Sequence, residues 1–237
     1  MERAETTAAY TPASNARARS TNNARRWVKA KGTSFIPLVV RPPSRVALVG
    51  VPRQAPFGTL STAIREAALA ATDFSWLQPG NRVLLKVMCN SPNPYPATTH
   101  PVAVTVMADL LREHGATVYV GDQSGVQFVH HTRRSQRGST RANFKNNGLE
   151  PAAQRGGATV ACFEEAGYDA YFAAEPPADS HFTREIFLPQ IVREVDHIIY
   201  LPRVSKHVLA GSTLGRRESS PSRPRPPLSR ISVWFGR

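Results

Sequence analysis

Short apolar runs, each separated from the next by a longer polar or amphipathic stretch, dominate the middle of the chain. Five of these runs have the length and composition of strands, and they lie at residues 45–51, 82–87, 117–120, 158–163 and 196–201. They are far shorter than the run of about 18 apolar residues that a membrane span requires. The pattern therefore predicts a chain built on strands, with no span across a membrane.

Apolar residues also recur at helical spacing between the runs. Leu60, Ile64 and Ala68 would share one face of a helix after the first run. A second helix is expected to begin at Pro101, which suits a first helical position, and to end at His114, before a glycine. Strands that alternate with helices favour an α/β fold with a mostly parallel, twisted sheet and helices on both faces. The cluster of turn residues at 146–148 predicts the end of a further, short helix.

Composition narrows the class of protein. The chain has 237 residues, of which 41% are hydrophobic, enough for a real core in one or at most two domains. Its two cysteines exclude a disulfide framework and any four-cysteine zinc or iron–sulfur site. Cys89 and Cys162 lie far apart in the sequence, and we expect both to be small buried residues rather than nucleophiles.

The net charge of +13 is concentrated at the two ends of the chain. Residues 1–45 carry nine lysines and arginines against two acids, residues 216–237 carry six arginines against one, and the middle is nearly neutral. Neither end has apolar periodicity, and prolines are closely spaced in the last stretch. The sequence therefore predicts a disordered basic segment at 1–44, an α/β domain at 45–215 and a disordered Arg/Pro-rich tail at 216–237.

These basic ends have two interpretations. Arginines beside Trp234 and Phe235 can bind nucleic acid or an anionic surface weakly and without sequence preference, whereas the plainer reading is a solvated tail. The Arg25-Arg26 pair resembles an export signal, and an arginine-rich leader also fits an organellar transit peptide. However, the apolar stretch of an export signal is missing and Pro37 breaks the short run that follows. A cytoplasmic location is expected.

Three loops follow predicted strands and qualify as sites by position, because ligands of open parallel sheets bind at the carboxyl ends of the strands. The first ends in Thr98, Thr99 and His100, where either threonine can cap the next helix or leave amides to face an anion. In the second, Asp122 can hold a metal or a hydroxyl group, or cap the next turn. The third leads to Lys206 and His207, which suit an acidic ligand or acid–base chemistry unless they form a solvated basic loop.

Other groups of chemically active residues give weaker evidence for a site. His130 and His131 are adjacent, so they point to opposite faces of a strand and do not suit joint metal binding. Glu164, Glu165 and Glu175 have no partner visible in the sequence that would make a carboxylate pair. There is no glycine-rich dinucleotide motif after the first strand and no phosphate-binding P-loop motif, which argues against both kinds of nucleotide site.

Five segments are specific in combination, although none is specific alone. They read VLLKVMCNSPNPYPATTHPVAV at 83–104, GDQSGV at 121–126, RGSTRANFKNNGL at 137–149, CFEEAGYDAYF at 162–172 and LPRVSKHVLAGSTLG at 201–215. Together they resemble the domain-of-unknown-function 362 family of prokaryotic α/β proteins over about residues 45–215. The family has no agreed activity, so the resemblance implies a fold and a shared site rather than a reaction.

The resemblance implies that the loops at the strand exits form this shared site. The positions it carries over are Lys86, Asn90, Thr98, Thr99, Asp122, Ser124, Lys206 and His207. Some relatives carry ferredoxin-like iron–sulfur modules, but the two cysteines of this chain predict no such cluster, and the cofactor is left open. After Gly215 the chain departs from the family pattern into Arg/Pro/Ser-rich sequence, which predicts a truncated or frameshifted end.

Three hypotheses for function follow. The first is that the protein, as an enzyme or a binding protein, has a site for a small anionic or metal-associated ligand. Its catalytic candidates are Lys206 and His207. In it, Lys86, Asn90, Thr98, Thr99, His100, Asp122 and Ser124 would bind the ligand, with Asp122 as the metal candidate. The second is a non-enzymatic module whose basic ends contact nucleic acid or an anionic surface. The third is a truncated, inactive gene product.

Overall fold

The computed structural model describes residues 46–175, 185–203, 205–207 and 211–213. The chain separates into Met1–Ser44 and Arg45–Arg237, and every described residue belongs to the second unit. The predicted disordered ends at 1–44 and 216–237 lie outside the described residues.

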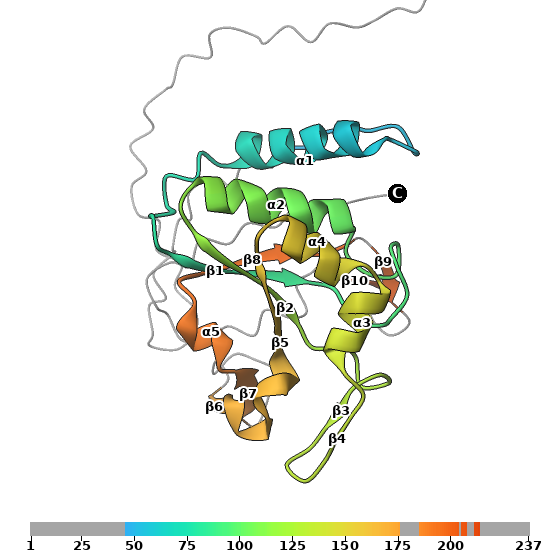
Figure 1. Cartoon of the computed structure of the whole chain (residues 1–237), viewed down its shortest axis with the longest axis vertical. Helices are drawn as coiled ribbons and strands as arrows, with labels where there is room; N and C mark the ends of the chain where they lie inside the picture. Colours follow the sequence, from blue (N-terminus) through green and yellow to red (C-terminus); the bar gives the residue numbers. More distant parts are fainter. Residues whose placement is uncertain (1–45, 176–184, 204, 208–210, 214–237) are drawn as a thin grey trace, which may run out of the picture. The chain divides into compact units, whose positions relative to one another are not determined.

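A four-stranded parallel sheet organises this unit (Figure 1). Its strands are β1 (Arg82–Val87), β2 (Thr117–Asp122), β5 (Thr159–Cys162) and β8 (His197–Leu201). They pair in the order β5-β2-β1-β8, and every pairing is parallel. Each strand coincides with one of the predicted apolar runs, and the predicted α/β class is confirmed.

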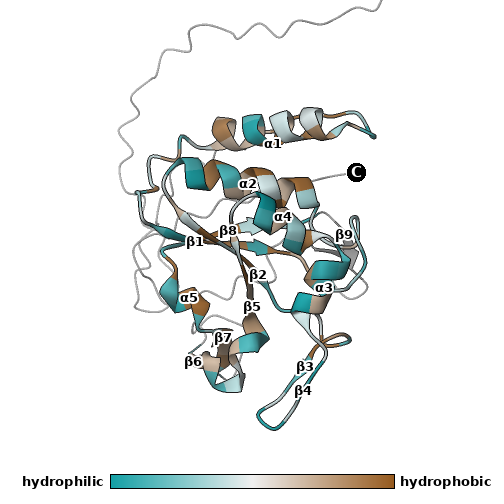
Figure 2. Ribbon diagram, viewed as in Figure 1, coloured by the Kyte–Doolittle hydropathy of each residue, from teal (hydrophilic) through white to brown (hydrophobic). Residues whose placement is uncertain are grey.

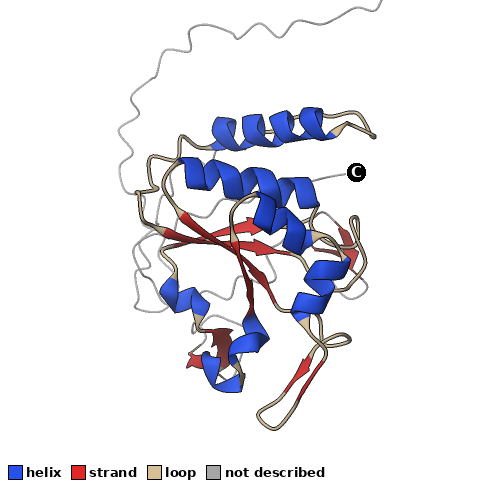
Figure 3. Cartoon of the chain, viewed as in Figure 1, coloured by secondary structure: helices blue, strands red, loops and turns tan. Residues whose placement is uncertain are grey.

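Three helices form a layer on one face of the sheet: α1 (Phe57–Ala71), α2 (Pro101–Glu113) and α4 (Leu149–Arg155). Figure 3 shows this layer beside the strands, with α2 next to both α1 and α4. Met107 and Leu110 of α2 are fully buried with Leu85 of β1 and Val120 of β2. This apolar layer, brown along the central strands in Figure 2, is the main core.

The opposite face of the sheet has a smaller cover. Leu84 of β1 and Ile198 of β8 form a second apolar cluster there with Val195. Ile191 of the one-turn helix α5 (Ile191–Glu194) and Phe163 pack against this cluster. Successive side chains of β1 point to opposite faces of the sheet, as in any strand, and therefore pack into two different apolar clusters.

Short elements connect and extend the sheet. They comprise the helix α3 (Thr140–Asn146), the 3₁₀ turns η1 (Phe163–Ala166) and η2 (Tyr168–Ala170), and three antiparallel hairpins. The hairpins are β3 (His130–His131) with β4 (Gln136–Arg137), β6 (Tyr171–Ala174) with β7 (Ile186–Pro189), and β9 (Ser205–His207) with β10 (Gly211–Thr213). The short helix expected to end at 146–148 is confirmed, whereas α4 and the three hairpins were not anticipated.

The predicted first strand is wrong. Residues 46–51 form no strand, and Leu48 keeps 90% of its surface exposed. Apolar composition favours a strand only where a neighbouring backbone supplies hydrogen-bond partners, and no described strand pairs with this segment.

The order of the strands sets the place for a site. The chain passes from β1 to β2 and on to β5 in one direction across the sheet, and then returns to place β8 on the other side of β1. Connections therefore diverge between β1 and β8. At such a switch point, the loops at the carboxyl ends of the strands leave room for a ligand.

Candidate functional site

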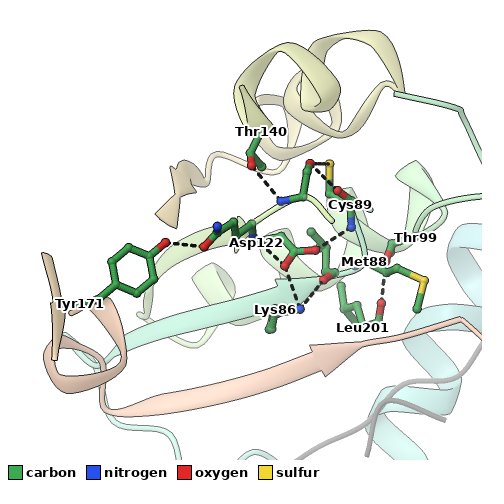
Figure 4. Close-up of polar contacts among 11 residues, drawn as sticks. Lys86, Met88, Cys89, Thr99, Asp122, Thr140, Tyr171 and Leu201 are labelled. Carbon is green, nitrogen blue, oxygen red and sulfur yellow. Dashed lines mark hydrogen bonds and ion pairs between the residues drawn. The ribbon is translucent and has the colours of Figure 1, made fainter. Parts of the chain in front are cut away.

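Lys86 and Asp122 meet at the carboxyl ends of β1 and β2. In the parallel register Lys86 lies opposite Gly121, so the aspartate that follows Gly121 comes within reach of the lysine. Lys86 Nζ lies 2.9 Å from Asp122 Oδ1 and donates to the carbonyl oxygen of Val87 at 3.2 Å (Figure 4). The side chains are only 13% and 5% exposed, so this ion pair is largely shielded from water.

Two backbone amides also donate to the Asp122 carboxylate. Cys89 N–H donates to Oδ2 at 2.7 Å and Gln123 N–H donates to Oδ1 at 2.7 Å. The carboxylate thus anchors the loop after β1 to the end of β2. Surrounding donors of this kind stabilise the ionised form of an aspartate. They do not resemble a metal site, and the described residues contain no group of three or more His, Cys, Asp or Glu side chains suited to a metal ion.

Thr99 joins the exit of β1 to the exit of β8. Its side chain is fully buried, and its Oγ1 accepts from Met88 N–H at 2.8 Å while donating to the carbonyl oxygen of Leu201 at 2.7 Å (Figure 4). Thr98 is buried as well, and its hydroxyl donates to the carbonyl oxygen of Asn93 at 3.3 Å. Neither threonine caps α2, which corrects one of the two roles expected for them.

His100 is the residue that caps α2. Its Nδ1 accepts from Val102 N–H at 3.2 Å, and Pro101 follows at the first helical position. The ring lies 4.5 Å from that of Tyr95, centroid to centroid. Burial lowers the pKa of His100, which favours the neutral ring that the cap requires. The capping role expected for a threonine thus belongs to the histidine beside it.

Ser124 belongs to a buried polar network behind the ion pair. Its Oγ donates to the carbonyl oxygen of Cys89 at 2.6 Å and accepts from Asn143 Nδ2 at 2.9 Å. Its N–H donates to Thr140 Oγ1 at 2.9 Å, which ties the strand exit to the start of α3. Asn90, by contrast, is exposed, and its carbonyl oxygen accepts from Gly125 N–H at 3.4 Å.

Lys206 and His207 lie in β9, five and six residues after the end of β8. The backbone of β9 pairs with β10, with Lys206 opposite Ser212 and His207 opposite Gly211. The side chains of both residues are outside the described part of the structure. The structure therefore brings Lys86, Thr99, Asp122 and Ser124 together, and the roles proposed for Lys206 and His207 stay predictions.

Sequence reasoning missed the roles of two residues beside the site, one fully buried and one half-buried. Glu164 is fully buried, and its Oε1 accepts from Thr140 N–H at 2.6 Å. Tyr171 donates its hydroxyl to Gln123 Oε1 (Figure 4), and burial together with the charge of Glu164 raises the pKa of Tyr171. Both partners are distant in sequence, so no local signal could have revealed them. Glu165, which showed no partner in the sequence, forms an ion pair with Arg141 at 2.6 Å.

Both cysteines are buried and free, as expected. Burial raises the pKa of Cys89 to about 12, and the nearby carboxylate of Asp122 adds to the effect. Asn147 Nδ2 donates to the Cys89 sulfur at 3.2 Å. Burial also raises the pKa of Cys162 to about 12. A thiol with so high a pKa stays protonated at neutral pH, so neither cysteine is suited to be a nucleophile.

The described part of the chain is an α/β protein whose polar residues gather at the carboxyl edge of a parallel sheet. Residues 83–218 match the family model described as "Domain of unknown function (DUF362)", and since this is more than half of the chain, the protein belongs to that family. The family predicted from the sequence is confirmed. No curated protein and no solved structure matches the chain.

One other prediction is tested in part, and another is not tested. Within the described residues, no helix is long and apolar enough to cross a membrane. The Arg/Pro-rich stretch after Gly215 lies outside the described residues, so its origin in truncation or a frameshift stays a prediction.

Proposed function

We propose that this protein binds a small anionic ligand at the carboxyl edge of its sheet, between the exits of β1, β2 and β8. The observation that carries the proposal is the ion pair between Lys86 and Asp122, which holds an ammonium group at the point where the strand order reverses. In this proposal Lys206 and His207 contact the anion or transfer protons to it, from the hairpin that follows β8.

The surroundings of Lys86 support an anionic ligand over a metal ion. The Lys86 side chain is 13% exposed, and Asp122, which would otherwise be the metal ligand, already accepts from two backbone amides besides the lysine. A carboxylate held by donors is a counter-ion that positions a cation, and that cation can attract an anionic group of a ligand. A metal, if one takes part, would therefore arrive with the ligand rather than bind Asp122 first.

The proposal is tested by thermal unfolding of the full chain with a panel of small anions. The panel contains phosphate, pyrophosphate, dicarboxylates and nucleoside phosphates, each with and without magnesium. A ligand present at about 100 times its Kd stabilises the folded state by about 2.7 kcal/mol, which for a chain of this size raises Tm by roughly 5–10 °C. If no member of the panel raises the Tm of the parent protein, the proposed site does not exist for these classes of ligand.

Variants locate the site. Lys86→Gln removes the cation but breaks a shielded ion pair, which costs about 3–5 kcal/mol and can itself unfold the protein. Lys206→Ala is therefore the second test, because this variant keeps both Lys86 and Asp122. Lys145→Ala removes an exposed lysine of α3 and serves as the matched control. We expect the shift in Tm to shrink with Lys206→Ala and to persist with Lys145→Ala. Equal shifts in both variants would contradict the role of Lys206.

Two finer predictions complete this proposal. We expect the protein in the cytoplasm, in line with the absence of an export-type apolar stretch near Arg25-Arg26. Binding of nucleic acid or an anionic surface through the basic ends is the alternative function. Deletion of residues 1–44 and 216–237 tests it, because salt-sensitive binding should then disappear.

A further inference from the structure

A second concentration of positive charge lies inside the folded unit, away from the basic ends. Residues 123–149 contain five lysines and arginines and no acidic residue, although the middle of the chain as a whole is nearly neutral. Three of the five, Arg133, Arg134 and Arg137, lie on or beside the antiparallel pair β3–β4. We call residues 126–138 the basic hairpin. Figure 1 shows it extending away from the sheet beyond α3.

The arginines of the basic hairpin are exposed, and none of them forms an ion pair with another residue in the described part of the chain. Arg133, Arg134 and Arg137 all lie at the surface, and no salt bridge joins any of them to another described residue. Most surface arginines of a folded protein lie near some acidic group, since mixed charge lowers the electrostatic free energy. A cluster without such a group produces a positive field that favours a polyanion.

Aromatic side chains flank the same surface. The Arg133 guanidinium lies 5.9 Å from the ring centroid of Tyr168, and the His131 ring packs edge-on against Tyr168 at 5.7 Å. Phe187, 55% exposed, has its ring 6.3 Å from that of Tyr168, and Phe128 on the basic hairpin is 39% exposed. Exposed rings beside unpaired arginines form the combination by which proteins stack bases and neutralise phosphates of single strands.

We propose that the basic hairpin, with the neighbouring rings of Tyr168 and Phe187, binds single-stranded nucleic acid. The arginines contact phosphates, for which a planar guanidinium is better suited than an ammonium group, and all three cations on the basic hairpin are arginines. The exposed rings of Phe128 and Phe187 stack on bases. An acidic protein partner would offer these rings no bases to stack on. This surface is separate from the ion pair of Lys86 and Asp122, so it does not depend on the function proposed above.

The test is fluorescence anisotropy of the full chain with a labelled oligothymidylate of about 20 nucleotides, measured from about 50 to 200 mM salt. The variant Arg133→Ala/Arg134→Ala/Arg137→Ala should bind at least about tenfold more weakly. The slope of log K against log salt should fall by about 2, because each phosphate contact on a single strand contributes about 0.7. The control Arg53→Ala/Lys145→Ala/Arg155→Ala removes the same charge from exposed positions elsewhere and keeps both basic ends.

The control variant distinguishes binding by the basic hairpin from non-specific attraction of the nucleic acid to the positive charge of the chain. We expect it to change the affinity by less than about twofold, since its residues lie outside the proposed surface. Equal losses in the two variants, or no loss in either, would overturn the proposal, because the basic ends of the chain would then account for binding. Unchanged Tm values in both variants show that any loss is not unfolding.

Phe187→Ala tests the aromatic part. We expect this variant to weaken binding of the oligothymidylate and to leave binding of inorganic polyphosphate unchanged, because polyphosphate has no bases to stack. If polyphosphate or polyglutamate binds the parent protein as tightly as the oligothymidylate at equal charge, the surface recognises polyanions or acidic proteins in general, and the assignment to nucleic acid is wrong. A double-stranded competitor should be weaker, since its bases are not available to the rings.

Discussion

At the scale of single residues, a few buried polar groups connect strand exits that are distant in sequence. The hydroxyl of Thr99 contacts Leu201, 102 residues further along the chain, and Asp122 contacts Cys89, 33 residues before it. Each contact satisfies a backbone group that would otherwise be buried without a hydrogen bond. Lys86, Thr99, Asp122 and Ser124 thus have structural roles that are visible directly, beside the ligand-binding roles proposed for them.

Thr99→Val should destabilise the fold although it hardly changes the volume of the side chain. The substitution leaves Met88 N–H and the carbonyl oxygen of Leu201 without this partner in a buried place, at a cost of about 1–3 kcal/mol for each group. Thr99→Ser keeps the hydroxyl and should lose much less. Urea unfolding measures the difference, and a Val variant as stable as the Ser variant would mean that the hydroxyl bridge contributes nothing.

The cap formed by His100 should make stability depend on pH. Burial lowers the pKa of His100 from its ordinary value of 6.5, so the unfolded chain binds a proton more readily than the folded one. The free energy of unfolding should therefore be largest above about pH 6.5 and decrease as the pH falls below it. Urea unfolding at about pH 7.5 and 5.5 measures this loss.

His100→Asn is the matched control for this effect. Asparagine is a good capping residue but does not titrate, so the variant should lose less stability on acidification than the parent. Some dependence on pH should remain, since burial also lowers the pKa of His197. An identical loss in parent and variant would show that His100 does not contribute to it.

At the scale of elements, backbone conformation and close contacts between backbones fix the positions of loops and hairpins, and composition alone does not reveal them. The basic hairpin returns to the body of the protein through Gly138, whose φ is +79°. A Cβ atom placed there would lie 1.8 Å from the carbonyl oxygen of Phe128. The close approach of these two backbones, rather than a turn type, requires glycine at this position.

Gly138→Ala should therefore disorder the base of the basic hairpin. Hydrogen exchange of residues 126–138 should become faster, while exchange in α2 stays slow, because the basic hairpin contributes few side chains to the core. Gly167→Ala is the control: its φ is +88°, but no atom lies within 4 Å of the added carbon. The added carbon in that variant meets no clash, so we expect only backbone strain, which costs about 1 kcal/mol. Equal exchange of residues 126–138 in the two variants would contradict the importance of the Phe128 contact.

At the scale of the whole molecule, the order of strands decides which loops can share a site. β1, β2 and β5 follow one another across the sheet, and only the return of the chain to β8 places the loop that leads to Lys206 and His207 beside the exit of β1. The apolar segment 46–51 takes no place in this sheet, although its sequence resembles that of the four strands that do. Membership of the family follows from residues 83–218, which include β2, β5, β8 and all of β1 except its first residue.

The sequence by itself determined the elements whose signal is local. β1, β2, β5, β8, α1 and α2 were all predictable, because apolar spacing and turn residues act within a few positions of one another. It also indicated that loops at strand exits would meet, and Lys86 with Asp122 confirms this for two of them. Only the tertiary structure decided that 46–51 is no strand, that His100 rather than a threonine caps α2, and that Glu164 is buried. Each of these features depends on whether the fold places a partner from a distant part of the chain beside the residue. The free energies of strand pairing and of burial are therefore not encoded in any short stretch of residues.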